Sequence, residues 1–108
     1  MDNWTFEIEN EHGSGVYAKR DLTIVRGAGA RLWDSAGNEY IDCTAGIGVA
    51  NIGHANPALS AAIKLQADTL ITCPEMFYND KRAKLLDKLT SITGFPRVFL
   101  CNSGTEAN

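Results

Sequence analysis

Residues 97–108 read RVFLCNSGTEAN, and this stretch decides the fold class. Residues 98–101 form a short, continuous apolar run, which is typical of a strand buried on both faces of a parallel sheet. Such a strand needs neighbouring strands, and the sequence supplies no similar run after it. We therefore predict an α/β protein of which these residues are one part, interrupted where a helix begins.

The polar corner after this apolar run predicts a phosphate site. Ser103 or Thr105 can cap a helix that runs on through Glu106. The first N–H groups of a helix have no partner within it, and the helix dipole adds positive charge there. Gly104 lets an anion approach the backbone, and the two hydroxyl groups are further donors. A plain strand-to-helix turn with a capping residue explains the same residues equally well.

Two helices are predicted upstream of this strand. The first spans residues 57–71, because Asn56 is a capping residue and proline follows it at the first helical position. The second begins at Asn79 or Asp80, and Gly94 ends it. Both segments carry apolar residues at helical spacing, as expected for helices with one apolar face.

Residues 22–42 predict a small antiparallel unit. Strand-like segments lie at 22–25, 31–33 and 39–42, and the residues at 34–38, DSAGN, are typical of a tight turn. The Gly-Ala-Gly sequence between the first two segments is expected to be a flexible connection.

The next segment, residues 43–59, reads CTAGIGVANIGHANPAL. Its glycine spacing matches neither the P-loop nor the dinucleotide-binding pattern, so a closely packed loop is favoured over a phosphate loop. His54 can act as an acid, a base or a ligand, or it can be a hydrogen-bonded side chain that fixes the loop. The second role is favoured, because no acidic or cysteine partner stands at ligand spacing.

Composition excludes several classes of protein. The chain has 108 residues, 44% of them hydrophobic, and a net charge of −3, which argues against a nucleic-acid partner. Cys43, Cys73 and Cys101 are widely spaced, so neither a disulfide framework nor a zinc or other metal site is expected. No apolar run is long enough for a membrane span, and the N-terminus does not read as a signal peptide. We expect a cytoplasmic protein.

Three stretches together resemble the class III aminotransferases, which are fold-type-I pyridoxal-phosphate enzymes. They are residues 26–57, RGAGARLWDSAGNEYIDCTAGIGVANIGHANP, residues 77–108, FYNDKRAKLLDKLTSITGFPRVFLCNSGTEAN, and within these the turn NSGTEAN. The EAN ending resembles acetylornithine aminotransferases and relatives acting on carrier-linked aminoadipate semialdehyde. Ornithine and 4-aminobutyrate aminotransferases, glutamate-1-semialdehyde aminomutase and a non-catalytic phosphate-binding module remain alternatives.

The resemblance implies a domain organisation. Residues 1–56 would form an N-terminal segment with the hairpin and the glycine-rich loop. Residues 57–108 would begin the large cofactor-binding domain, a mostly parallel sheet with helices on both faces. It also implies a homodimer whose active site lies between the subunits.

The resemblance further implies site residues. Ser103, Gly104 and Thr105 would grip the phosphate of pyridoxal 5'-phosphate, and Glu106 would lie near the cofactor ring or support a residue that does. The loop 46–54 would lie on the substrate side near the subunit interface. Within this loop Ile47 stands where several relatives carry an aromatic residue. Outside it, Phe77 and Tyr78 match a stretch near the entrance, where packing is an equal alternative.

The implied reaction moves an amino group from an N-acetylornithine-like ω-amine to the cofactor and then to a 2-oxo acid, 2-oxoglutarate. The family's Schiff-base lysine, its aspartate on the ring nitrogen and its arginine for the substrate carboxylate have no counterpart in residues 1–108. We therefore expect no catalytic residue in this chain and no transaminase activity from it alone.

Overall fold

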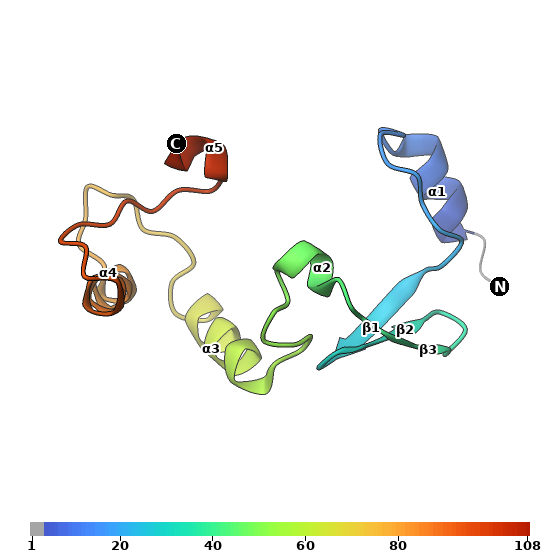
Figure 1. Ribbon diagram of the computed structural model, residues 1–108, viewed down its shortest axis with the longest axis horizontal. Helices are drawn as coiled ribbons and strands as arrows, with labels where there is room; N and C mark the ends of the chain where they lie inside the picture. Colours follow the sequence, from blue (N-terminus) through green and yellow to red (C-terminus); the bar gives the residue numbers. More distant parts are fainter. Residues whose placement is uncertain (1–3) are drawn as a thin grey trace. The chain divides into compact units, whose positions relative to one another are not determined.

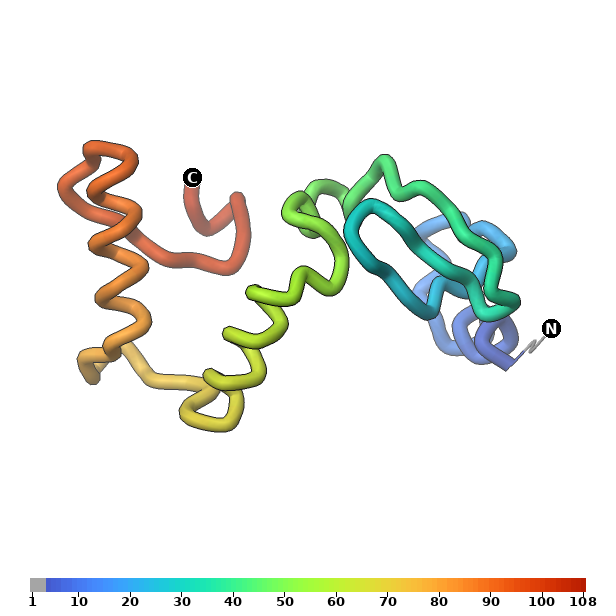
Figure 2. Tube along the Cα trace, turned by 90° about the horizontal axis from the view of Figure 1, so that it is seen from below, coloured from blue at the N-terminus to red at the C-terminus, as the bar shows by residue number. Residues whose placement is uncertain are grey.

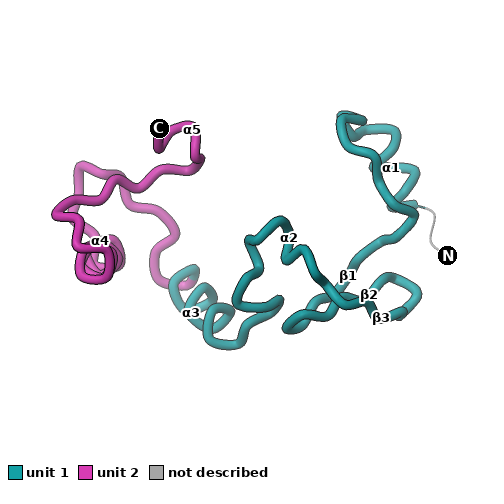
Figure 3. Tube along the Cα trace, in the orientation of Figure 1, with its two compact units in different colours: residues 1–67 teal, residues 68–108 magenta. Residues whose placement is uncertain are grey.

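The structure is a computed structural model that describes residues 4–108. It divides into two compact units, residues 1–67 and 68–108, and each unit is described by itself (Figure 3). The domain boundary expected after residue 56 stays a prediction.

Unit 1 begins with helix α1 (Trp4–His12) and continues into a three-stranded antiparallel sheet (Figure 1). The strands β1 (Ile24–Ala28), β2 (Arg31–Asp34) and β3 (Glu39–Ile41) lie side by side in that order, which confirms the predicted antiparallel unit. Strand β1 includes Gly27 and Ala28, which were expected to belong to a flexible connection. They are part of the strand because Gly27 pairs with Leu32 across the hairpin.

The turn between β2 and β3 is organised by the carboxylate of Asp34, a buried residue that is 6% exposed. It accepts hydrogen bonds from the backbone N–H groups of Ala36 and Asn38 at 3.0 and 2.8 Å, from Asn38 Nδ2 at 2.9 Å, and from the Tyr40 hydroxyl at 2.8 Å. The Asn38 side chain is the main cause that lowers the pKa of Asp34, and Asp34 in turn raises the pKa of Tyr40. This network fixes the register of the two strands.

Helix α3 (Pro57–Ala67) confirms the predicted helix start. Asn56 Oδ1 accepts the N–H groups of Ala58 and Leu59 at 3.1 and 3.2 Å, as a capping residue does. The helix ends at Ala67 rather than near residue 71, since the Asp-Thr pair that follows has low helix propensity.

Unit 2 contains helix α4 (Asp80–Thr93) and the one-turn helix α5 (Gly104–Ala107). Asn79 caps α4 by accepting the N–H of Arg82 at 2.9 Å, and Gly94 ends it with a left-handed φ of 74°. An irregular segment leads from α4 to α5 (Figure 2). Residues 98–101 lie in this segment and form no strand, and the Phe99 side chain is 78% exposed. The reason is physical: the described chain offers no neighbouring strand to pair with them.

No apolar side chain of residues 4–108 is buried. Hydrogen bonds in helix caps, turns and short strand pairings therefore define the helices and strands, rather than a hydrophobic core. Within the same residues, no helix has the length and apolar character needed to cross a membrane.

Candidate functional site

The turn before α5 is a reciprocal cap built by Ser103 and Glu106. Ser103 is extended, with φ −146° and ψ 156°, and its Oγ accepts the N–H of Glu106 at 3.2 Å. The same hydroxyl donates to Glu106 Oε2 at 2.8 Å, and the Asn102 N–H donates to that oxygen at 3.0 Å. The spacing S-x-x-E is that of a capping box, so a local hydrogen-bond pattern sets the conformation of the turn.

This turn leaves two adjacent backbone donors. Within the described part of the chain, the N–H groups of Gly104 and Thr105 donate no hydrogen bond, as expected for the first positions of a helix. A Cβ added at Gly104 would meet no atom within 4 Å, so the side-chain position of Gly104 is open. Two neighbouring N–H groups without a hydrogen-bond acceptor among residues 4–108 suit an oxygen-rich anion.

The side chains at this turn have different roles. The Ser103 hydroxyl is already engaged with Glu106, whereas the Thr105 hydroxyl has no hydrogen-bond partner among residues 4–108. Thr105 is therefore the better placed hydroxyl donor. The Glu106 carboxylate serves the cap, so its observed role is structural.

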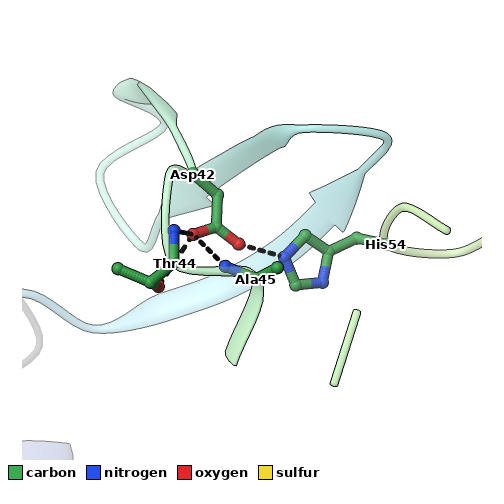
Figure 4. A network of polar contacts seen from close by, with 4 residues as sticks. All are labelled: Asp42, Thr44, Ala45 and His54. Atoms are coloured by element: carbon green, nitrogen blue, oxygen red, sulfur yellow. Dashed lines mark hydrogen bonds and ion pairs between the residues drawn. The ribbon is translucent and has the colours of Figure 1, made fainter. Parts of the chain in front are cut away.

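A second polar cluster lies at the start and end of the glycine-rich loop (Figure 4). Asp42 follows β3 directly, and its Oδ1 accepts the N–H and Oγ1–H of Thr44 at 2.8 and 2.9 Å and the N–H of Ala45 at 2.9 Å. The other oxygen, Oδ2, lies 2.6 Å from His54 Nε2. The Asp42 side chain is only 5% exposed and that of His54 is 25% exposed. One carboxylate thus joins the two ends of the loop.

The hydrogen bond from His54, followed by those from Thr44 and Ala45, holds the pKa of Asp42 well below its ordinary value. The carboxylate is therefore ionised over the whole neutral range and can only accept hydrogen bonds. It follows that His54 Nε2 carries the proton it shares with Asp42.

His54 is also attached to the sheet. Its backbone N–H donates to the Gly29 carbonyl at 2.9 Å, and its carbonyl accepts the Gly29 N–H at 2.9 Å. Its side chain covers Gly27, where an added Cβ would come within 2.7 Å of the His54 Cβ. The close backbone approach that this loop was expected to make lies at Gly53, where an added Cβ would come 3.1 Å from the Gly29 Cα.

Acidification is expected to open this loop. The folded-state pKa of Asp42 lies below that of an unfolded chain, so the stability it contributes is complete above about pH 5 and is lost as the pH falls through its folded-state value. Hydrogen exchange of the Thr44 and Ala45 amides, corrected for intrinsic rates, should begin to lose protection below about pH 4 and lose it progressively as the pH falls further. The Asp42→Asn variant has no carboxyl group to titrate at this position. If its Thr44 and Ala45 amides lost protection at low pH in the same way, Asp42 would not be the group responsible.

Other residues singled out in the sequence have exposed side chains in the structure. Ile47, in the short helix α2 (Ala45–Gly48), is 97% exposed, and Phe77 and Tyr78 are exposed as well. The loop 43–54 belongs to unit 1, whereas the Ser103 turn belongs to unit 2.

The sequence reasoning missed Asp42 as the partner of His54. The signal was present, because a loop that starts after β3 and returns to the hairpin brings its two ends together.

The family model described as aminotransferase class-III matches residues 15–108, and the chain belongs to this family. This confirms the resemblance on which the sequence reasoning relied.

Two curated relatives show how similar the chain is to individual members of the family. The chain is 50% identical over 101 residues to the [LysW]-aminoadipate semialdehyde transaminase of Deinococcus radiodurans, with 92% of this chain and 24% of the relative covered. It is 40% identical over 108 residues to the acetylornithine aminotransferase of Methanocaldococcus jannaschii, covering 100% of this chain and 27% of the relative. The chain thus spans about a quarter of the length of these curated relatives.

Solved structures confirm the predicted fold class. The acetylornithine aminotransferase of Elizabethkingia anophelis has a TM-score of 0.92 at 34% identity, over 97% of this chain and 27% of that one. An ornithine aminotransferase of Toxoplasma gondii, in which pyridoxal phosphate partly occupies the active site, has a TM-score of 0.91 at 34% identity, over 99% and 25% of the two chains. The hairpin and helices of this chain therefore match one part of a fold-type-I aminotransferase.

Proposed function

We propose that this chain is the N-terminal part of a cytoplasmic pyridoxal-phosphate aminotransferase that moves an amino group from an N-acetylornithine-like ω-amine to 2-oxoglutarate, in arginine or lysine biosynthesis. The identity to two relatives with such donors, 50% and 40%, supports the donor class. The observation that carries the proposal is the pair of N–H groups at Gly104 and Thr105, which have no hydrogen-bond acceptor among residues 4–108.

The residues of the turn fit the phosphate group of the cofactor. Gly104 and Thr105 would hold it with backbone N–H groups, and the Thr105 hydroxyl would add a third donor. Ser103 and Glu106 would keep the turn rigid, so that little order is lost on binding. The bound cofactor supplies an electron sink for the carbon that carries the amino group.

Other parts of this chain have supporting roles in the proposal. The loop 46–54 would face the substrate near the interface of a homodimer, and Phe77 and Tyr78 would lie near the entrance. Their exposure in the described chain leaves their side chains available for such contacts. The groups that perform the proton transfers would come from sequence outside residues 1–108.

The test compares the full-length protein with the isolated chain of 108 residues. We expect the full-length protein to bind pyridoxal phosphate with a visible absorbance band and to form glutamate from N-acetylornithine and 2-oxoglutarate. The isolated chain should form none. Turnover by the isolated chain, or a full-length protein without bound cofactor, would each overturn the proposal.

Ornithine is the second candidate donor, because ornithine aminotransferases reach the same structural similarity as the acetylornithine enzyme. The ratio of kcat/KM for N-acetylornithine to that for ornithine decides between them. A carrier-linked aminoadipate substrate, assayed in the same way, separates the lysine branch from the arginine branch.

A further inference from the structure

The glycine-rich loop has an unusually strained backbone. Ala45 and Ile47 in this loop, and Ala55 directly after it, have φ values of 49°, 61° and 50°, in the left-handed region that residues with a Cβ disfavour. Such conformations persist only where the surrounding structure holds them. They are concentrated at active sites and ligand-binding segments, where they pre-organise the backbone for binding.

Apolar packing does not hold this loop. Ile47 is almost fully exposed, Val49 is also exposed, and no apolar side chain of the described residues is buried. Its restraints are polar and lie at its ends. Asp42 binds Thr44 and Ala45 at the start and His54 at the end.

His54 transmits this restraint to the sheet. Its backbone pairs with Gly29 and its side chain lies against Gly27, so the end of the loop cannot shift without breaking contacts to β1 and its turn. The hydrogen bond to Asp42 then brings the start of the loop to the same point.

We propose that Asp42 and His54 are positioning residues. Their hydrogen bond closes the loop 43–53 and holds residues 45–48, which have left-handed backbone, in the conformation that receives the substrate. This rests on the proposed function, in which the loop faces the substrate. The pair acts through the loop, and neither side chain is required to touch the reacting atoms.

The geometry specifies which replacement of His54 preserves the bond. The contact uses Nε2, which is farther from the backbone than Nδ1. A glutamine amide reaches about as far as Nε2, and an asparagine amide reaches only about as far as Nδ1. His54→Gln should therefore keep the bond to Asp42, whereas His54→Asn should lose it. His12, an exposed histidine whose Nε2 lies 4.0 Å from Glu11 Oε2, supplies the control variant His12→Gln.

The structural arm measures hydrogen exchange of residues 44–54 in the full-length protein. His54→Asn should speed the exchange of the Thr44 and Ala45 amides by about tenfold or more, because a hydrogen bond to a charged group shifts a local opening equilibrium by that much. His54→Gln and His12→Gln should stay within about twofold of the parent protein. Equal acceleration in His54→Gln and His54→Asn, or none in either, overturns the proposal.

The kinetic arm separates positioning from general stability. His54→Asn should raise the KM for the amino donor about fivefold or more while kcat and the absorbance of bound cofactor change by less than about twofold. His54→Gln should restore the KM. Loss of cofactor together with kcat, without a selective rise in KM, would mean a merely structural role and would overturn the proposal. If instead the parent protein binds no cofactor and shows no turnover, the proposed function fails, while the exchange data still report on the loop closure.

Discussion

Replacing Gly104 by proline is expected to weaken the binding of pyridoxal phosphate by about 10- to 100-fold while the turn stays folded. Proline removes the backbone N–H at the first position of α5, where no helical hydrogen bond is lost. The residue before it must be extended, and Ser103 already is, with φ −146° and ψ 156°. The substitution therefore removes one proposed phosphate donor without disturbing the cap.

The measurement is a titration of the full-length apoprotein with pyridoxal phosphate, followed by its absorbance. Gly104→Ala is the matched control, since it keeps the N–H group and its Cβ meets no atom within 4 Å. We expect the alanine variant to bind the cofactor more tightly than the proline variant, because only alanine keeps the N–H group. Equal affinity of the proline and alanine variants would exclude the Gly104 N–H as a phosphate donor.

Replacing Gly27 by alanine is expected to weaken the attachment of the glycine-rich loop to the sheet by about 1–3 kcal/mol. The added Cβ would lie 2.7 and 2.8 Å from His54 Cβ and Cγ and 3.2 Å from Leu32 Cδ2. The first two contacts are too short for carbon atoms, so the His54 ring or the strand must move. Exchange protection of the Gly29 and His54 amides, which form the bridge, reports the loss.

A double-mutant cycle assigns this effect to one contact. His54→Gly removes both atoms that meet the new Cβ, so Gly27→Ala should cost much less in the His54→Gly background. An equal cost in both backgrounds would show that backbone freedom at Gly27, rather than contact with His54, determines the effect.

Local signals in the sequence predicted much of this structure. Asn56 caps the helix start at which the sequence placed it. For the other two starts the sequence offered Asn79 or Asp80 and Ser103 or Thr105, and the caps are Asn79 and Ser103. These starts could be predicted because a cap depends on side chains within three residues of the backbone it satisfies. The turn at 34–38 followed from its composition for the same reason.

Features that depend on distant partners were harder to predict. The Asp42–His54 hydrogen bond joins residues twelve apart, and it exists only because the loop returns to the hairpin. Residues 98–101 carry the composition of a buried strand, yet composition cannot supply the neighbouring strand that pairing requires. The family resemblance, rather than residue spacing, singled out the Ser103 turn as a cofactor site.

The absence of buried apolar side chains in residues 4–108 has a consequence for biosynthesis on the ribosome. Once residues 4–108 have left the ribosome, they can already form their caps, their hairpin and the Asp42–His54 closure, since these contacts use only residues within that range. Their apolar residues, such as Phe99 and Ile71, would still face water and be open to chaperones and to self-association. On the proposed function, the rest of the protein covers them, so slow synthesis of that part would prolong their exposure and favour misfolding.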